Sequence, residues 1–332
     1  MSQENKRELL GAVLNNESIG RVPVGFWWHF VSGSDLLNGY RDAAILSRVV
    51  AGHKQMLESY NPDFMKIMSD GFFAHPALVE QNVTTIEGVR SVRPMERSHP
   101  WIAKQVEMVQ ELSKTAHDKM MTFYNVFSPL QALRLNIKYC GEDPYAFQEM
   151  MMDYPEELVG LSEIIASDYR LLAEELKKHT KIDGIYYSVQ NVQHPDADED
   201  YHKRFVFPTE LRLLSDLNTL WENNILHICG YDHFKNKIEY YREYPAKLYN
   251  WATHTDGVTM AEGKRIFNAP ILGGFDNNRG TLLDSGSFEE LETFVLRLIA
   301  ETGRQGLVIG ADCTIPSDID IRRLQFIRDI AR

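Results

Sequence analysis

Short apolar runs rich in β-branched and aromatic residues alternate along the chain with longer stretches in which apolar residues recur at helical spacing. The eight runs are residues 22–28, 63–68, 120–126, 183–188, 223–229, 247–252, 270–275 and 307–311. Each run has the length and composition of a buried β-strand. Amphipathic segments lie between most of them, and those at 156–179 and 288–302 keep their apolar residues on one stripe of a helix.

This alternation predicts a parallel sheet, because a strand–helix–strand connection is a right-handed crossover that covers the sheet with helices. Eight such units predict a closed (β/α)8 barrel, the TIM-barrel fold, in the α/β class. We expect a single domain over residues 1–332, with an N-terminal helical segment at about 1–20. The active site of such a barrel lies at the carboxyl ends of the strands, in the loops that follow them.

The composition narrows the classes of function. Of 332 residues, 44% are hydrophobic and 25% are charged, which is ordinary for a globular protein. The net charge of −12 argues against binding to nucleic acid or to an anionic membrane surface, since both need clustered Lys and Arg. Three cysteines are too few for a disulfide framework, and neither a signal-like apolar segment nor a membrane-length apolar run is present. We therefore expect a cytoplasmic protein whose partners are small molecules or other proteins.

Three residues with metal-binding side chains stand at the ends of two predicted strands. His227 and Cys229 end the fifth run, and Cys313 follows the eighth. Residues two apart on an extended strand point to the same face. One imidazole and two thiolates suit zinc, and three protein ligands leave a fourth position open, as in catalytic rather than structural zinc sites. The alternative is a buried strand histidine and two inert thiols.

Several motifs resemble the uroporphyrinogen decarboxylase superfamily, whose members are (β/α)8 barrels. They are His227-Ile228-Cys229-Gly230, Gly273-Gly274-Phe275-Asp276 and Gly310-Ala311-Asp312-Cys313-Thr314-Ile315-Pro316. In one branch, the corrinoid-dependent methyltransferases that act on methylcobamide and coenzyme M or related acceptors, a His-x-Cys and a distant Cys bind zinc. The resemblance implies that His227, Cys229 and Cys313 bind zinc. It also implies transfer of a methyl group from a methylcorrinoid, or a small methylated donor, to a zinc-activated thiol, with a corrinoid carrier protein as a partner.

The decarboxylases of the superfamily suggest an alternative. They use no metal or cofactor, and they bind an acidic tetrapyrrole with arginines after the first strand and an aspartate of a Ser-Asp pair after the second. Ser69-Asp70 matches that pair, so Asp70 would be the catalytic carboxylate of a cofactor-free decarboxylase. However, Trp27-Trp28-His29 stands where the arginines would be, and Asp312 stands at the family's histidine position. Because a highly acidic substrate would lack cationic partners, we favour the methyltransferase. A third alternative is a corrinoid-binding protein without turnover.

Other polar residues are expected at the same end of the barrel. Asp312 precedes a proposed ligand, and it would act in catalysis by orienting His227 or a zinc-bound water. The alternative is a helix cap or a rim residue. Trp28 and His29 would form a substrate-binding wall for a corrinoid or an aromatic methoxy compound, although core packing is the commoner role of such aromatic residues.

The loops after the fourth and seventh predicted strands contain further polar residues. Asp276 and Arg279 follow the seventh strand in a Gly-flanked loop, where barrels often bind an anionic group of the substrate. An ordinary turn is the alternative. The acidic segment 190–203 follows the fourth strand, and we interpret it as a lid or rim loop, with a plain surface loop as the alternative. The resemblance to the decarboxylases also suggests a homodimer.

Overall fold

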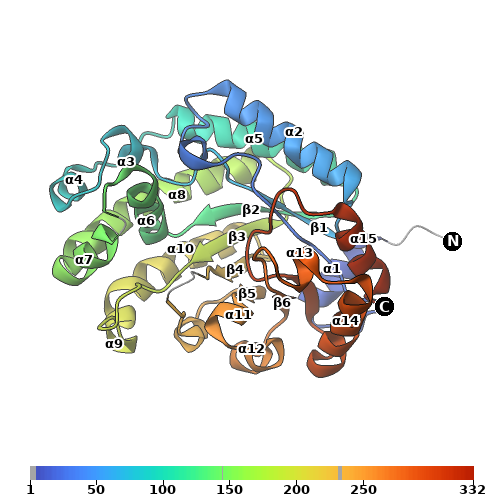
Figure 1. Cartoon of the computed structure of the whole chain (residues 1–332). Helices are drawn as coiled ribbons and strands as arrows, with labels where there is room; N and C mark the ends of the chain where they lie inside the picture. Colours follow the sequence, from blue (N-terminus) through green and yellow to red (C-terminus); the bar gives the residue numbers. More distant parts are fainter. Residues whose placement is uncertain (1–4, 144, 231–233) are drawn as a thin grey trace.

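The computed structural model describes residues 5–143, 145–230 and 234–332. Within these residues, seven strands form one sheet in which each strand pairs in parallel with the next in chain order. The strands are β1 (Phe64–Ile67), β2 (Met121–Phe127), β3 (Gly184–Val189), β4 (Ile225–Ile228), β5 (Leu248–Trp251), β6 (Ile271–Phe275) and β7 (Leu307–Ala311). They fall on seven of the eight apolar runs, which confirms the predicted parallel order. The strands occupy the centre of the molecule and the helices surround them (Figure 1).

The first predicted strand, residues 22–28, forms a single bridge instead of a regular strand. Val24 bridges to Ile309 of β7 in parallel, and the Ile309 N–H donates to Pro23 O (2.9 Å). On the other side the Asp63 N–H donates to Val24 O (3.0 Å). The ladder stops there because Pro23 has no N–H and the Val24 N–H is taken by the Asp63 carboxylate (2.8 Å). The segment still joins β7 to β1, so the (β/α)8 fold is confirmed with one reduced strand.

Helices connect successive strands and cover the outside of the sheet (Figure 1). The helices predicted at 156–179 and 288–302 are formed as α8 and α14, and α14 begins at a capping box made by Ser287 and Glu290. None of the helices in the described part of the chain is long and apolar enough to cross a membrane. The α-helices are α1 (Lys6–Leu14), α2 (Ala43–Ser59), α3 (Pro76–Glu80), α4 (Ile86–Ser91), α5 (Pro100–Ala116), α6 (Pro129–Cys140), α7 (Ala146–Asp153), α8 (Pro155–His179), α9 (Glu199–Tyr201), α10 (Phe207–Leu220), α11 (Thr253–Asp256), α12 (Met260–Phe267), α13 (Leu282–Ser285), α14 (Phe288–Thr302) and α15 (Ile321–Ile330). Two 3-10 turns, η1 (Gly33–Leu37) and η3 (Ile238–Tyr241), and one π-helical turn, η2 (His202–Val206), complete the helical segments.

Apolar side chains fill the amino-terminal part of the barrel interior. One side chain from each strand packs there beside Trp27, and these are Phe64, Phe123, Tyr186, Ile225, Leu248, Leu272 and Val308. Leu10, Val13 and Leu14 of α1 pack against the same cluster, so the N-terminal helix closes this end of the barrel. The interior at the opposite, carboxyl end of the strands is where a barrel places its functional side chains.

Candidate metal centre

The structure brings His227, Cys229 and Cys313 together at the carboxyl end of the barrel. One ligand atom from each lies within 4.8 Å of the other two. The two sulfurs are 3.9 Å apart, and Cys313 Sγ is 3.7 Å from His227 Nε2. The strands β4 and β7 end on the same rim, which explains how residues far apart in sequence converge.

These distances fit a tetrahedral zinc site. With Zn–S bonds of about 2.3 Å and a Zn–N bond of about 2.0 Å, tetrahedral angles place two sulfurs about 3.8 Å apart and a sulfur about 3.5 Å from a nitrogen. The sulfur–sulfur separation and the separation between Cys313 Sγ and His227 Nε2 lie within a few tenths of an ångström of these values, and all three ligand atoms lie within 4.8 Å of one another. The donor set of one imidazole and two thiolates is also one that zinc prefers. The side chains therefore fit this metal with little movement.

Asn250 of β5 fixes the orientation of His227. Its amide N–H groups donate to Leu272 O (2.8 Å) and Ala311 O (3.2 Å), which can only accept. The amide oxygen must therefore face the other way, where it accepts from the Tyr186 hydroxyl (2.7 Å) and lies 2.5 Å from His227 Nδ1. Since this oxygen can only accept, Nδ1 carries the proton and Nε2 presents its lone pair to the sulfur of the cluster. A cation between His227 Nε2 and Cys313 Sγ would accept electron pairs from both atoms.

The two cysteines titrate as a pair. The pKa of Cys313 lies well below the usual thiol value, chiefly because the Cys229 thiol donates a hydrogen bond to its sulfur. The pKa of Cys229 lies well above that value, chiefly because of the same hydrogen bond. The hydrogen bond thus favours the thiolate at Cys313 and the thiol at Cys229, and a metal bound to both sulfurs would displace the thiol proton.

Lys66 of β1 places a positive charge beside the cluster. Its Nζ lies 3.9 Å from the centre of the Tyr186 ring and 5.0 Å from that of Trp27. Burial lowers the pKa of Lys66 to about 8, while the sulfurs of Cys313 and Cys229 act in the opposite direction. The lysine is therefore a buried cation that anionic groups at the cluster stabilise.

A cavity of about 170 Å³ opens directly onto the side chains of His227, Cys229 and Cys313. Both cysteines and His227 form part of its wall, and both cysteines are partly exposed to it. The basic residues Lys66, Arg134 and Lys138 and the aromatic residues Phe73 and Phe127 line other parts. The cavity is thus suited to a small molecule with an anionic group.

Arg134 is held rigidly in this wall. Its guanidinium donates to Gln131 Oε1 (2.8 Å) and Asn191 O (2.7 Å), and it also bonds to Gln190 Oε1. The Phe147 ring lies 4.5 Å from its Cζ. Gln190 belongs to the acidic segment 190–203 and also lines the cavity, so the start of that segment forms part of the rim.

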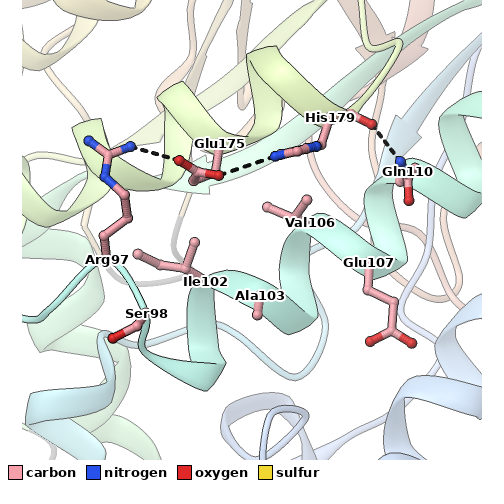
Figure 2. Close-up of a pocket in the computed structure, with 9 residues that line it drawn as sticks. All are labelled: Arg97, Ser98, Ile102, Ala103, Val106, Glu107, Gln110, Glu175 and His179. Atoms are coloured by element: carbon pink, nitrogen blue, oxygen red, sulfur yellow. Dashed lines mark hydrogen bonds and ion pairs between the residues drawn. The ribbon is translucent and has the colours of Figure 1, made fainter.

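A larger groove, of about 570 Å³, lies on the outer surface between α5 and α8 (Figure 2). Its floor consists of Ile102, Ala103 and Val106, and several of its polar groups pair with one another, as Glu175 does with His179 (3.4 Å). These groups are ordinary helix-surface contacts and do not converge on a central point (Figure 2). The smaller cavity is therefore the candidate site.

Asp312 does not orient His227, contrary to one form of the prediction. Its oxygens accept from Thr253 Oγ1 (2.6 Å) and from the His254 N–H (2.8 Å), and one lies 3.0 Å from His254 Nδ1. The hydrogen bond that the His254 ring donates to Asp312 raises the pKa of His254. Since Asn250 already occupies His227 Nδ1, Asp312 anchors the loop after β5 to the end of β7 instead.

Of the two residues predicted to form a substrate-binding wall, His29 lines the cavity and Trp28 does not. Side chains alternate along the extended segment, so Trp27 and His29 point inward and Trp28 points outward. The Trp28 ring packs 6.2 Å from Phe30 and 6.4 Å from Tyr60, in the core between the barrel and its helices. Its predicted substrate-binding role therefore does not fit the structure.

Asp70 is fully buried, and both of its oxygens are occupied. Oδ1 lies 2.9 Å from His29 Nδ1, and Oδ2 accepts from the Phe30 N–H (2.7 Å). A decarboxylase would need this carboxylate free to contact a substrate. In this structure Asp70 instead holds His29 in position.

The loop after β6 folds as an ordinary turn. Asp276 Oδ1 accepts from the backbone N–H and the side-chain amide of Asn278 (2.9 and 2.8 Å). Arg279 is exposed and paired with Asp318 (2.6 Å). Neither Asp276 nor Arg279 is among the residues that line the cavity, so the anion-binding role predicted for this loop stays a prediction.

The prediction from sequence missed three residues of the site, Asn250, Lys66 and Arg134. Asn250 and Lys66 interrupt two of the apolar runs that predict strands, and both are buried. A buried amide or ammonium group in a strand is costly unless it has a partner, which makes such an interruption a usable signal. Arg134 lies in a helix and gives no comparable signal.

Comparison with known proteins extends the description of the fold. No protein-family model and no curated protein sequence matches this chain. The chain is similar in structure to a methyltransferase from Methanosarcina mazei, with a TM-score of 0.67 and 11% sequence identity over 99% of this chain and 98% of that one. It is also similar to a B12-independent methionine synthase from Shewanella sp. W3-18-1 solved in complex with selenomethionine, with a TM-score of 0.57 and 12% identity over 93% and 96% of the two chains. The shared property is the barrel fold.

Proposed function

We propose that this protein is a zinc-dependent methyltransferase that moves a methyl group from a methylcorrinoid, or a small methylated donor, to a thiol. The observation that carries the proposal is the convergence of His227 and two cysteine sulfurs within 4.8 Å of one another, with the sulfur–sulfur and Cys313–His227 separations close to those of tetrahedral zinc. Two barrels of the same fold are named as a methyltransferase and a methionine synthase, which is compatible with it.

Each residue of the site would have a defined task. His227, Cys229 and Cys313 would hold the metal, and Asn250 would keep His227 in the tautomer that can bind it. When bound, zinc would act as a Lewis acid that lowers the pKa of the acceptor thiol from about 8.5. The cavity would hold the thiol in line with the methyl group, which is the main requirement of a methyl transfer.

The size of the cavity indicates which of the two substrates, the thiol or the corrinoid, can bind inside it. A volume of about 170 Å³ accommodates a small thiol but not a corrinoid ring. Pockets that enclose drug-sized molecules have volumes of about 300 to 1,000 Å³. We therefore propose that the acceptor enters the cavity, next to Lys66, Arg134 and Lys138, and that a corrinoid donor approaches the mouth from outside, for instance on a carrier protein.

The cofactor-free decarboxylase fits the same geometry less well. Asp70, its required carboxylate, is buried and bonded to His29 and the Phe30 N–H. The convergence of two partly exposed thiols and an imidazole suits a metal, whereas a cofactor-free decarboxylation does not require it. Conversion of uroporphyrinogen by metal-free protein would reverse this preference.

Metal analysis of freshly purified protein tests the proposal. We expect about one zinc per chain in the wild type and a loss of most of that zinc in Cys229→Ser and Cys313→Ser. Cys140→Ser is the matched control, because Cys140 lies at the end of α6 outside the cluster. Protein from zinc-replete cells that contains no metal, or a Cys140→Ser variant that loses zinc equally, would contradict the proposal. Demethylation of methylcobalamin in the presence of 3-mercaptopropionate, followed by its absorption spectrum, tests the reaction itself.

A further inference from the structure

His29 and Asp70 form a pair at the wall of the cavity that the proposed metal site does not use. His29 Nδ1 lies 2.9 Å from Asp70 Oδ1, and the other Asp70 oxygen accepts from the Phe30 N–H (2.7 Å). The His29 side chain is 35% exposed, whereas Asp70 is 0% exposed. His29 lines the same cavity as Cys229 and Cys313. An accessible imidazole is thus backed by a buried carboxylate.

The carboxylate sets the tautomer of this imidazole. The buried carboxylate of Asp70 accepts one hydrogen bond from the Phe30 N–H and a second from the Nδ1–H of His29. His29 Nε2 then has a lone pair, and it forms no hydrogen bond with the residues that the structure describes. The ring is held from one side by Phe73, whose centre lies 5.3 Å away in an edge-on arrangement. Geometry of this kind, a base oriented by a second group, is typical of general acid–base pairs.

We propose that His29 is the base that accepts the proton of the acceptor thiol. The inference depends on the proposed function, in which that thiol enters the cavity. Its S–H bond breaks, the proton passes to His29 Nε2, and the electron pair of the bond stays on the sulfur, which thereby becomes the nucleophile. Asp70 stabilises the imidazolium that forms, and the proton leaves to solvent after the product departs.

The other titratable groups around the cavity cannot take this proton equally well. His227 bonds to Asn250 through Nδ1 and directs Nε2 at the cluster. Lys66 is already cationic at neutral pH, and the cysteine sulfurs are the proposed ligands. The charged groups around His29 are therefore the Asp70 carboxylate, which contacts it, and the cations Lys66, Arg134 and Lys138, which line the same cavity. A thiolate that forms in the cavity would lie among these cations, which stabilise its charge.

Counting protons during thiol binding tests the proposal. Zinc-loaded protein would be titrated with 3-mercaptopropionate at pH 7.5 in buffers with different enthalpies of ionisation. Wild-type protein should release almost no proton to the buffer, because His29 retains it. His29→Gln should release about one proton per thiol bound, since binding of a thiol as thiolate must free one. 3-(Methylthio)propionate, which has no S–H group, should release none from either protein.

His179→Gln is the matched control, because His179 is also an exposed histidine paired with a carboxylate, but it lies in the outer groove (Figure 2). It should behave as the wild type. Equal proton release from wild type and His29→Gln would overturn the proposal. If His29→Gln does not fold, release of a full proton by the wild type alone would overturn it as well.

An experiment with cobalt-substituted protein distinguishes failure of the proposed role of His29 from failure of the proposed methyltransferase function. Thiol binding to the metal would appear as a change in the cobalt absorption bands, in wild type and in His29→Gln alike. Absence of that change in both proteins would mean that the metal does not bind the thiol, which contradicts the proposed function. A normal change with an unaltered proton count would contradict the role of His29 alone.

Discussion

The barrel interior has two layers with opposite chemistry, and the same strands supply both. Five strands each place an apolar residue in the lower layer and a polar one two positions later in the upper layer. The pairs are Phe64 and Lys66, Phe123 and Asn125, Tyr186 and Ser188, Ile225 and His227, and Leu248 and Asn250. Because side chains alternate with a period of two, residues two apart face the same interior. The apolar layer is closed by α1, and the polar layer opens into the cavity.

The comparison shows how differently the two layers must be stabilised. The apolar layer needs close packing and little else. In the polar layer each buried group needs a specific partner, as when Asn125 donates to Ser69 Oγ (2.8 Å) and accepts from Ser188 Oγ (2.9 Å). On β7 this level is occupied by Gly310, where a Cβ would lie 2.9 Å from Gly25 O. The polar layer thus contributes the chemistry and the apolar layer contributes most of the stability.

Phe123→Ala in the apolar layer should have the largest effect on stability. Phe123 is fully buried and packs edge-on against Phe64, with ring centres 6.2 Å apart. Its truncation should lower the free energy of unfolding by about 3–5 kcal/mol. Urea denaturation measures this loss, and metal analysis of the folded fraction should still give the wild-type zinc content. A variant that loses zinc while it remains folded would show that the layers are not independent.

Lys66→Met in the polar layer should stabilise the metal-free protein. Burial lowers the pKa of Lys66 from 10.5 to about 8, so the charged form is disfavoured in the folded state. Between these two values the unfolded chain binds more protons, and stability therefore rises with pH. The full penalty applies below pH 8, where the substitution should add up to about 3 kcal/mol, and this gain should disappear as the pH approaches 10.5. Denaturation at pH 7 and pH 10 measures it, and a gain that does not depend on pH would contradict the assignment.

Asn250→Ala should weaken zinc binding by about 10- to 100-fold, because His227 loses the group that fixes its tautomer. Asn224→Ala is the matched control at the other end of the strands. Asn224 is equally buried, accepts from the Ile185 N–H (2.7 Å) and donates to Trp221 O (2.9 Å), but it does not contact the cluster. Both variants should lose about 1–3 kcal/mol of stability. Competition with a chelator should detect weaker zinc binding in Asn250→Ala alone, and equal weakening in both would contradict the role of Asn250.

The sequence predicted the apolar layer and the convergence of His227, Cys229 and Cys313 better than the contacts between polar residues. Apolar runs with helices between them determine the barrel, because burial of period-two and period-3.6 patterns leaves few other arrangements. Strand ends also place His227, Cys229 and Cys313 on one rim without knowledge of any contact. The reduced first strand was not predictable in this way, since it depends on a tertiary hydrogen bond from Val24 to the Asp63 carboxylate.

The spacing of residues along the sequence does not reveal which polar side chains contact one another in the folded protein. Asp312 was expected beside His227 because it is adjacent to Cys313 in sequence, yet consecutive residues at a strand end point in different directions. Asn250 reaches His227 from the neighbouring strand, with which His227 is in register. Trp28 was grouped with His29 for the same reason of adjacency, and alternation separates the two. The choice of partner is therefore decided by strand register and side-chain direction.

Arg279→Ala should have the smallest effect on stability and on thiol binding. It tests whether a residue near the barrel mouth in sequence takes part in the site. Arg279 was expected to bind an anionic group, but it is 65% exposed and paired with Asp318, which is 67% exposed. Such a surface pair contributes about 0–1 kcal/mol to stability. Binding of 3-mercaptopropionate to the zinc-loaded variant should equal that of the wild type, whereas Lys138→Ala in the cavity wall should bind it more weakly. Calorimetry measures both affinities. Weaker binding by Arg279→Ala would show that the loop after β6 takes part in binding the thiol.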